Sequence, residues 1–356
     1  MKINPANIFC TLFDSNYLDK GLALYESLKM HAESFQLFIF AFDEVTFRIL
    51  NEMKLENVWV IKEQDFMFDE LENVKKIRKR SEYCWTCTPI IIEYALEHYN
   101  LHACTYIDAD MFFYTDPAIL FEEIEEDSCS VSIIEHRFIK HIEYAQSEKL
   151  HGKYCVEFNT FYNDEYGRKV LRRWKEQCME CCSSTGENGW FGDQKYLDDW
   201  TADFEKVHVL QHVGAGVAPW NITRYYYVKS EAGNIILQEK GSDKNVELIF
   251  YHFHNLKFES EKIVKLGIYN RPGRVDDALV KVVYTPYFEA ICRIRKMLER
   301  EYAIHFSYES ERDTVKSKVD SQQRKRRIID VLIAILAVGR DLCTKKKDIY
   351  FINIDK

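Results

Sequence analysis

The first 107 residues alternate between apolar runs of strand length and helical patterns. Residues 7–13, 35–42 and 58–61 are apolar runs, and a helical stripe of leucines follows the first of them. Residues 83–99 have a helical pattern, with Pro89 near the expected start. Strands that alternate with helices in this way predict an α/β fold on a largely parallel sheet.

Two aspartates end the next apolar run, residues 103–107. Residues i and i+2 of an extended chain point the same way, so Asp108 and Asp110 can converge on one cation. Oxygen ligands suit Mg²⁺ or Mn²⁺. A polar turn after a strand explains the two aspartates about as well, but the strand before them and the aromatic run after them favour a metal.

Polar residues also follow the first strand, at Asp14-Ser15-Asn16. Ligands of parallel sheets bind at the carboxyl ends of the strands. We therefore expect Asp14 and Asp108 to share one site.

The second half of the chain continues the pattern to about residue 275. Residues 128–134, 156–162, 207–210 and 248–253 read as strands, and residues 166–182 read as a helix. Beyond residue 275 the chain is expected to be helical.

Composition limits the partners and the compartment. The net charge of −9 makes the chain a poor nucleic-acid binder. The eleven cysteines lack zinc-ribbon spacing, and no secretory signal opens the sequence, so we expect reduced thiols, no structural zinc and a cytoplasmic protein.

The order of the motifs between residues 7 and 260 resembles that of the GT-A fold glycosyltransferases, and most closely that of glycosyltransferase family 8. Leu12-Phe13-Asp14-Ser15-Asn16-Tyr17 is similar to the opening nucleotide loop of this family, and Asp108-Ala109-Asp110 is similar to its metal-binding DxD motif. Phe158-Asn159 resembles the motif at the donor sugar. Asp193-Gln194 resembles the pair that faces the transferred sugar.

A late histidine motif completes the resemblance. His252-Phe253, followed by Lys257, resembles the family motif in which the histidine completes the metal shell and the lysine grips the diphosphate. His254 and His212 are weaker candidates for the metal. The family also has an arginine two residues after a tyrosine before the DxD strand. Trp85 stands there in this chain, and Arg80 or Arg78 is a possible substitute.

The resemblance implies a GT-A domain with a mixed, mainly parallel sheet, a bound Mn²⁺ or Mg²⁺, and a nucleotide-diphosphate sugar as co-substrate. The implied metal ligands are Asp108, Asp110 and His252, and the implied catalytic residues are Asp193 and Gln194. The implied nucleotide-sugar contacts are Thr11, Phe13, Asp14, Asn16, Tyr17, Arg80, Asp108, Ala109, Asn159 and Lys257.

The end of the chain differs in character from the rest. Residues 316–348 contain ten Lys/Arg and four Asp, and the apolar stretch 328–338 is too short to span a bilayer. This pattern fits either an interfacial membrane segment over residues 324–347 or a core-packed helix with a basic rim. We expect a catalytic domain over residues 1–265, a helical extension over 266–315 and a tail over 316–356.

These observations predict a metal-dependent hexosyltransferase that uses a UDP-sugar and a glycan or glycolipid acceptor of lipopolysaccharide or capsule type. The resemblance implies retention of configuration, whereas the residues alone also allow inversion with Asp193 as general base. One alternative is a sugar nucleotidyltransferase, although its glycine-rich loop with a basic residue is not found at residues 12–17. The other is an inactive nucleotide-sugar-binding protein at the membrane.

Overall fold

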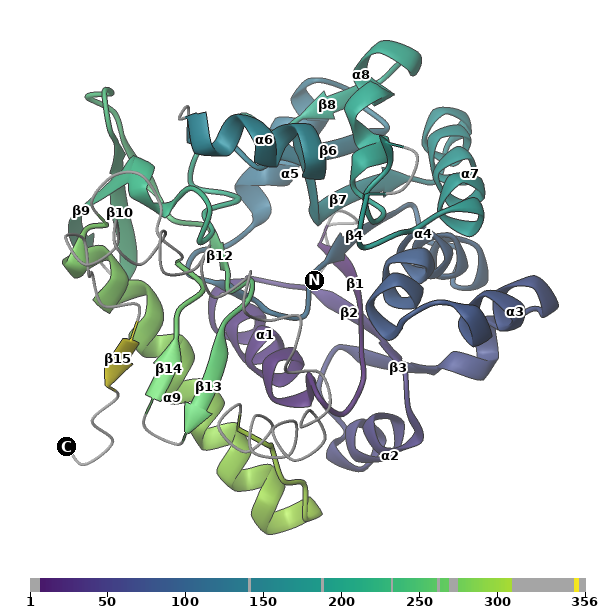
Figure 1. Cartoon of the computed structure of the whole chain (residues 1–356), viewed down its shortest axis with the longest axis horizontal. Coiled ribbons are helices and arrows are strands. Elements are labelled where there is room, and N and C mark those ends of the chain that lie inside the picture. The colour runs from purple at the N-terminus through teal and green to yellow at the C-terminus, as the bar shows by residue number, and fades with distance from the viewer. Residues whose placement is uncertain are drawn as a thin grey trace, which may run out of the picture.

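A seven-stranded sheet forms the centre of the molecule (Figure 1). The computed structural model describes residues 7–139, 142–186, 189–231, 233–260, 263–268, 275–308 and 349–351. In spatial order the strands are β3 (Val58–Lys62), β2 (Gln36–Ala41), β1 (Ile8–Phe13), β4 (Ala103–Ile107), β7 (Tyr154–Tyr162), β6 (Val131–Glu135) and β8 (Val207–Val209). The strands from β3 to β4 run parallel, β7 runs antiparallel to both of its neighbours, and β8 is parallel to β6. The predicted α/β class with a mixed, mainly parallel sheet is confirmed.

Helices cover both faces of this sheet. One core contains residues of α1 (Leu18–His31), α2 (Glu44–Met53), α5 (Ala118–Glu126) and α9 (Asp277–Tyr302). The other contains residues of α3 (Asp69–Ile77), α4 (Arg80–His98), α7 (Glu165–Glu180) and α8 (Trp200–Asp203). β1 is apolar throughout because it is buried on both faces: Phe9 and Phe13 belong to the first core, and Cys10 and Leu12 to the second.

The sheet has a switch point between β1 and β4. β1 pairs with β2 on one side and with β4 on the other, and the register places Cys10 opposite Tyr106. The loops after these two strands therefore leave the same edge of the sheet, as we expected for Asp14 and Asp108. A crevice outside the carboxyl ends at such a point is the usual ligand site of open α/β sheets.

Close packing of α1 on β1 fixes the first of these loops. An added Cβ at Gly21 would lie 2.4 Å from the ring of Phe13, so the helix can approach the strand this closely only with glycine at that position. The backbone N–H of Tyr17 donates to the carbonyl oxygen of Asp14 at 2.9 Å and closes the turn before α1.

The structure differs from the predictions around α4 and after residue 222. The helix begins at Arg80, three residues before the predicted start at residue 83. Pro89 therefore lies inside the helix and not near its start. Residues 225–247, for which the sequence suggested no element, form a small antiparallel sheet of β9 (Tyr225–Glu231), β10 (Asn234–Glu239) and β11 (Asn245–Glu247). The remaining elements are β5 (Met111–Phe113), α6 (Ile142–His151), β12 (Phe250–His252), β13 (Lys257–Ser260), β14 (Ile263–Lys265), β15 (Ile349–Phe351) and the 3₁₀ helices Glu63–Phe66, Lys195–Asp199 and Ile222–Arg224.

Helix α9, the last helix among the described residues, packs against α1, as Figure 1 shows. Arg295 Nε lies 2.6 Å from Oδ2 of Asp19, whose side chain is 1% exposed, and the Arg293 guanidinium binds Glu26 through both of its terminal nitrogens. The helix predicted beyond residue 275 is confirmed over Asp277–Tyr302, whereas residues 349–351 form a strand, β15, that pairs with β14. None of the described helices has the length and apolarity to span a membrane. The segment expected to contact a membrane, residues 324–347, lies outside the described residues.

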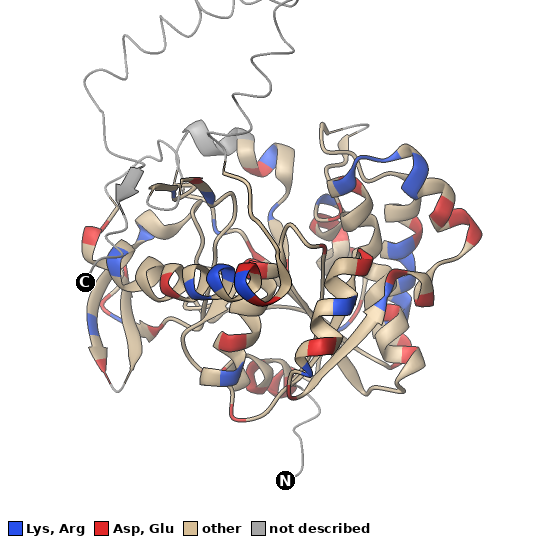
Figure 2. Ribbon diagram, turned by 90° about the horizontal axis from the view of Figure 1, so that it is seen from below, with Lys and Arg blue, Asp and Glu red and all other residues tan. Residues whose placement is uncertain are grey.

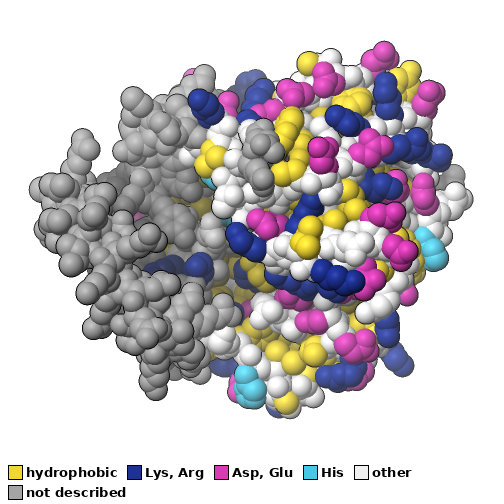
Figure 3. All heavy atoms as spheres, turned by 45° about the vertical axis from the view of Figure 1, so that its right-hand side comes forward, with side chains coloured by type: hydrophobic (Ala, Val, Ile, Leu, Met, Phe, Trp, Pro, Cys, Tyr) yellow, Lys and Arg dark blue, Asp and Glu magenta, His cyan; other side chains and the backbone are white. Residues whose placement is uncertain are grey.

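Charges of both signs are interspersed over the ribbon (Figure 2). On the face turned forward in Figure 3, the hydrophobic side chains form small patches between acidic and basic ones. These two views therefore show no large area of a single charge on the described residues that they display.

Candidate active site

Asp110 and His252 lie side by side because two short strands pair. β5 follows Asp110 and pairs antiparallel with β12, which places Met111 opposite His252. The backbone N–H of Phe253 donates to the carbonyl oxygen of Asp110 at 2.9 Å. Nε2 of His252 is then 3.1 Å from Oδ1 of Asp110 and 3.5 Å from Oδ2 of Asp108. The three predicted metal ligands therefore surround one position.

Glu157 of β7 holds the other nitrogen of this imidazole. Its Oε2 lies 2.6 Å from Nδ1 of His252, and the Glu157 side chain is fully buried. A carboxylate on one ring nitrogen orients the second nitrogen toward a metal. The sequence-based predictions did not include Glu157. A lone acid within the apolar run of β7 was the available signal, because carboxylates are seldom buried without a partner.

Lys20 of α1 also reaches the cluster and was not predicted. Its Nζ lies 3.7 Å from Oδ2 of Asp110, and both side chains are 11% exposed. The same ammonium lies 3.9 Å from the centre of the Tyr17 ring. α1 carries two lysines, Lys20 and Lys29, so the sequence alone did not indicate which of them is buried.

The acidic groups of the cluster outnumber its cations. Burial, together with the Asp110 carboxylate, raises the pKa of Asp108 to about 7, although His252 opposes the rise. Burial alone would raise the pKa of Asp110, but the charges of His252 and Lys20 hold it below its usual range. Burial alone would lower the pKa of His252, but Asp110 raises it well above its usual value.

This donor set fits a divalent cation. Two carboxylates and an imidazole suit Mn²⁺ at least as well as Mg²⁺. The raised pKa of Asp108 reflects burial and repulsion that a cation between the carboxylates would relieve. Among the described residues, Oε1 of Glu157 is also buried without a hydrogen-bond partner.

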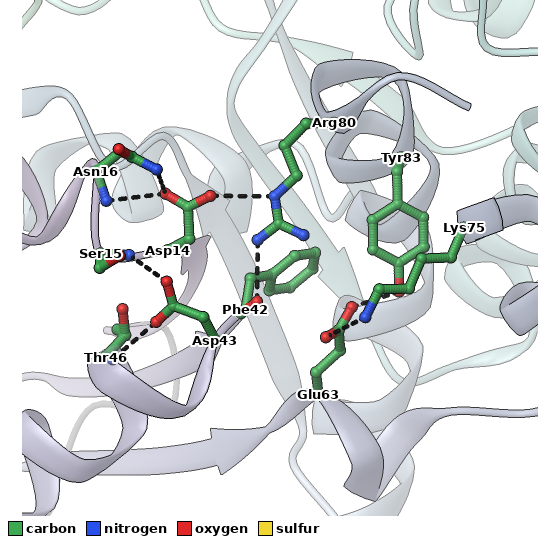
Figure 4. A network of polar contacts seen from close by, with 10 residues as sticks. All are labelled: Asp14, Ser15, Asn16, Phe42, Asp43, Thr46, Glu63, Lys75, Arg80 and Tyr83. Carbon is green, nitrogen blue, oxygen red and sulfur yellow. Dashed lines mark hydrogen bonds and ion pairs between the residues drawn. The ribbon is translucent and has the colours of Figure 1, made fainter. Parts of the chain in front are cut away.

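A second polar network lies at the end of β1 (Figure 4). Oδ1 of Asp14 accepts from the backbone N–H of Asn16 at 3.0 Å, and Oδ2 accepts from Nε of Arg80 at 3.0 Å. Arg80 also donates to the carbonyl oxygen of Phe42 at 2.9 Å. Arg78 is used elsewhere: it binds the carbonyl oxygens of Cys178 and Met179. Of the two candidate arginines, only Arg80 contacts Asp14.

Asp193 lies in the loop before the 3₁₀ helix Lys195–Asp199. Its carbonyl oxygen accepts from Nε1 of Trp174 at 2.8 Å, which fixes the loop on α7. Burial, followed by the charge of Asp108, raises the pKa of Asp193 to about 8. The residue is 4% exposed. The amide of Gln194 donates to the carbonyl oxygen of His151 at 2.8 Å.

The other predicted contacts differ in exposure. The side chains of Thr11, Phe13, Ala109 and Asn159 are buried. Among the described residues, neither amide atom of Asn159 has a hydrogen-bond partner. Tyr17 is 43% exposed, and Lys257 is exposed at the start of β13. Two further histidines, His254 and His212, belong to none of the possible metal clusters of the described chain.

No protein-family model matches this chain. It is 31% identical over 300 residues to the uncharacterized protein YfnF of Bacillus subtilis (strain 168), a match that covers 83% of this chain and 95% of YfnF. The chain belongs to the YfnF family. YfnD, an uncharacterized protein of the same strain, is 28% identical over 286 residues, which cover 78% of this chain and 86% of YfnD.

The solved structures that resemble this YfnF-family chain have low sequence identity to it and TM-scores below 0.5. An active-site mutant of LgtC is 10% identical with a TM-score of 0.48, over 70% of this chain and 87% of that one. Mouse xyloside xylosyltransferase 1 is 13% identical with a TM-score of 0.41, over 69% and 97%. The glycosyltransferase GlyE of Streptococcus pneumoniae TIGR4 is 15% identical with a TM-score of 0.39, over 58% of this chain and 46% of GlyE. TM-scores below 0.5 are too low to assign an activity, so the function must be argued from the site.

Substitution of Lys20 tests the charge balance of this YfnF-family site. Without divalent cations, Lys20→Met should lower the free energy of unfolding by about 2 kcal/mol, because Asp110 loses a buried counter-charge. Added Mn²⁺ should then raise Tm more in the variant than in the wild type. Thermal unfolding with EDTA and with Mn²⁺ measures both. Lys29→Met, on the exposed side of the same helix, is the matched control. An equal response of Lys20→Met and the wild type to Mn²⁺ would contradict this role.

Proposed function

We propose that this protein is a metal-dependent glycosyltransferase of GT-A type that transfers a sugar from a UDP-sugar to a glycan or glycolipid acceptor with retention of configuration. The observation that supports this most is the convergence of Asp108, Asp110 and the Nε2 of His252 at the sheet switch point. The Asp14–Arg80 network follows the neighbouring strand. Both groups of residues lie at the sheet edge where α/β proteins bind nucleotides.

The chemistry of the donor explains why such a site is needed. A sugar nucleotide leaves a diphosphate whose negative charge grows as the glycosidic bond breaks. A divalent cation held by Asp108, Asp110 and His252 would neutralise that charge. Glu157 keeps His252 oriented through its 2.6 Å contact, and Lys20 adds a buried positive charge beside Asp110.

The remaining residues take the roles that the resemblance to glycosyltransferase family 8 implies. Asp14, with Asn16 and Arg80, presents hydrogen-bonding groups for the base and ribose. Arg80 keeps the Asp14 carboxylate oriented at 3.0 Å. Lys257 is assigned to the diphosphate and Asn159 to the donor sugar, whose hydroxyl groups would pair the unpartnered amide of Asn159.

Asp193 is the residue assigned to the transferred sugar. Its carboxyl group, with a pKa of about 8, is mainly protonated at neutral pH. A group with a pKa near the operating pH both releases and accepts a proton readily. Asp193 thus suits contact with the reacting sugar and the acceptor hydroxyl, and Gln194 lies next to it in the chain.

A thermal-shift screen tests the proposal. Protein treated with EDTA and desalted is mixed with UDP, GDP, ADP or CDP, each with and without Mn²⁺. UDP and Mn²⁺ together should raise Tm by several degrees, since a ligand at 100 times its Kd stabilises by about 2.7 kcal/mol. UDP alone or Mn²⁺ alone should raise Tm much less, because the diphosphate and the carboxylates bind the same cation. A protein that no nucleotide stabilises, or that UDP stabilises equally without Mn²⁺, would overturn the proposal.

A further inference from the structure

A second group of metal-binding side chains lies at the β8 edge of the sheet. His208 is the middle residue of β8, and Asp127 and Cys129 follow the end of α5. One ligand atom from each lies within 4.8 Å of those of the other two. β7 and β6 separate this edge from the β1–β4 switch point, so the cluster is distinct from the candidate active site.

Both ring nitrogens of His208 face carboxylates. Nδ1 lies 2.6 Å from Oδ2 of Asp127, and Nε2 lies 2.6 Å from Oε1 of Glu123. Glu123 is itself fixed, because it accepts from the backbone N–H groups of Gln211 at 2.6 Å and His212 at 3.2 Å. The fixed carboxylate holds one nitrogen of the buried imidazole and leaves the other directed toward Asp127 and Cys129.

This arrangement has the chemistry of a zinc site. Imidazole nitrogen, thiolate sulfur and carboxylate oxygen are the three ligand types that Zn²⁺ takes in proteins. A carboxylate on the distal nitrogen of the histidine is the usual orienting partner of such a ligand. We propose that His208 Nδ1, Cys129 Sγ and a carboxylate oxygen of Asp127 bind a zinc ion, with Glu123 as the positioning residue and water as the fourth ligand.

The contact between His208 and Asp127 is compatible with this proposal. Tetrahedral ligands with bonds of about 2.0 Å lie about 3.3 Å apart, so Asp127 must withdraw slightly from its hydrogen-bonding distance of 2.6 Å. The Asp127 side chain is 60% exposed and can make this movement. The ammonium of Lys206 lies 4.2 Å from the centre of the Tyr166 ring.

A simple ion pair is the competing explanation. An imidazolium held between Glu123 and Asp127 would need no thiol, whereas the zinc site requires Cys129. Zinc binding would tie the end of α5 to the edge strand β8. The proposal does not depend on transferase activity.

Cobalt and zinc titration of the full-length protein after EDTA treatment tests the site. Wild-type protein should give the near-ultraviolet absorption of a thiolate–Co²⁺ bond, and Zn²⁺ should remove it by displacement. Cys129→Ser should lose this absorption and bind Zn²⁺ at least about 10-fold more weakly at this site. Cys181→Ser is the matched control, because Cys181 is also partly buried and lies outside the cluster. Absorption that is absent from the wild type, or that is as strong in Cys129→Ser as in Cys181→Ser, would overturn the proposal.

Two further measurements complete the test. The first uses only the wild type and so does not depend on the folding of a variant, and the second tests the role of Glu123. In the wild type, Zn²⁺ should slow alkylation of Cys129 at least about 10-fold, and leave that of Cys181 unchanged, as read by mass spectrometry. Glu123→Gln should keep the cobalt absorption and weaken zinc binding about 10- to 100-fold, because a neutral amide is a weaker partner for Nε2–H. Equal alkylation of Cys129 with and without Zn²⁺ would contradict the site even if the variants misfold.

Discussion

Replacing Asp110 with asparagine should lower Mn²⁺-dependent hydrolysis of a UDP-sugar donor by at least about 10³-fold and abolish the joint stabilisation by UDP and Mn²⁺. The substitution keeps the shape of the side chain and removes its charge. It thereby removes the charge pairing of Asp110 with His252 at 3.1 Å and with Lys20 at 3.7 Å. Donor hydrolysis followed by UDP release, together with Tm, measures the two effects.

The exposed residue Asp203 on α8 provides the control for this experiment. Asp203→Asn removes the same charge from the chain at a distance from the cluster and should leave hydrolysis and ligand stabilisation unchanged. If Asp110→Asn keeps Mn²⁺-dependent hydrolysis at the wild-type rate, the cluster is not the metal site of the reaction.

Replacing Asp193 with asparagine should lower sugar transfer by about 10²-fold or more while stabilising the metal-free protein at alkaline pH. The pKa of Asp193 is about 8 in the folded protein, and its ordinary value is 3.8. Between these values the folded state keeps a proton that the unfolded state has lost, so this group makes the protein less stable as pH rises from about 4 to about 8. Asparagine does not ionise, so Asp193→Asn does not lose stability in this way as pH rises.

The pH dependence of the stability difference is the decisive readout. The free energy of unfolding of Asp193→Asn, minus that of the wild type, should grow by a few kcal/mol between pH 5 and pH 8 and level off above pH 8. Denaturant unfolding in EDTA without nucleotide measures it, and Asp203→Asn should show no such trend. A constant difference across this range would mean that the Asp193 carboxyl is already ionised at neutral pH in the folded protein.

Local patterns were sufficient to predict the central sheet and the two loops at its edge. β1, β2 and β4 are continuous apolar runs because helices cover both of their faces. The acidic loops after β1 and β4 are visible in the sequence because each directly follows such a run. The start of α4 was missed because Arg80, Ser81 and Glu82 interrupt the apolar pattern. In the structure Glu82 caps the helix through the backbone N–H of Lys79.

What the sequence determined by itself is the α/β order of strands and helices, and the positions of Asp14, Asp108 and Asp110 at strand ends. The tertiary structure alone decided which distant side chains join them. His252 reaches Asp110 through the pairing of β12 with β5, and Glu157 reaches His252 from β7. His208 similarly meets Glu123 across the β8 edge. Such contacts join residues far apart in the chain, and local hydrophobic periodicity carries no information on the strand pairing that creates them.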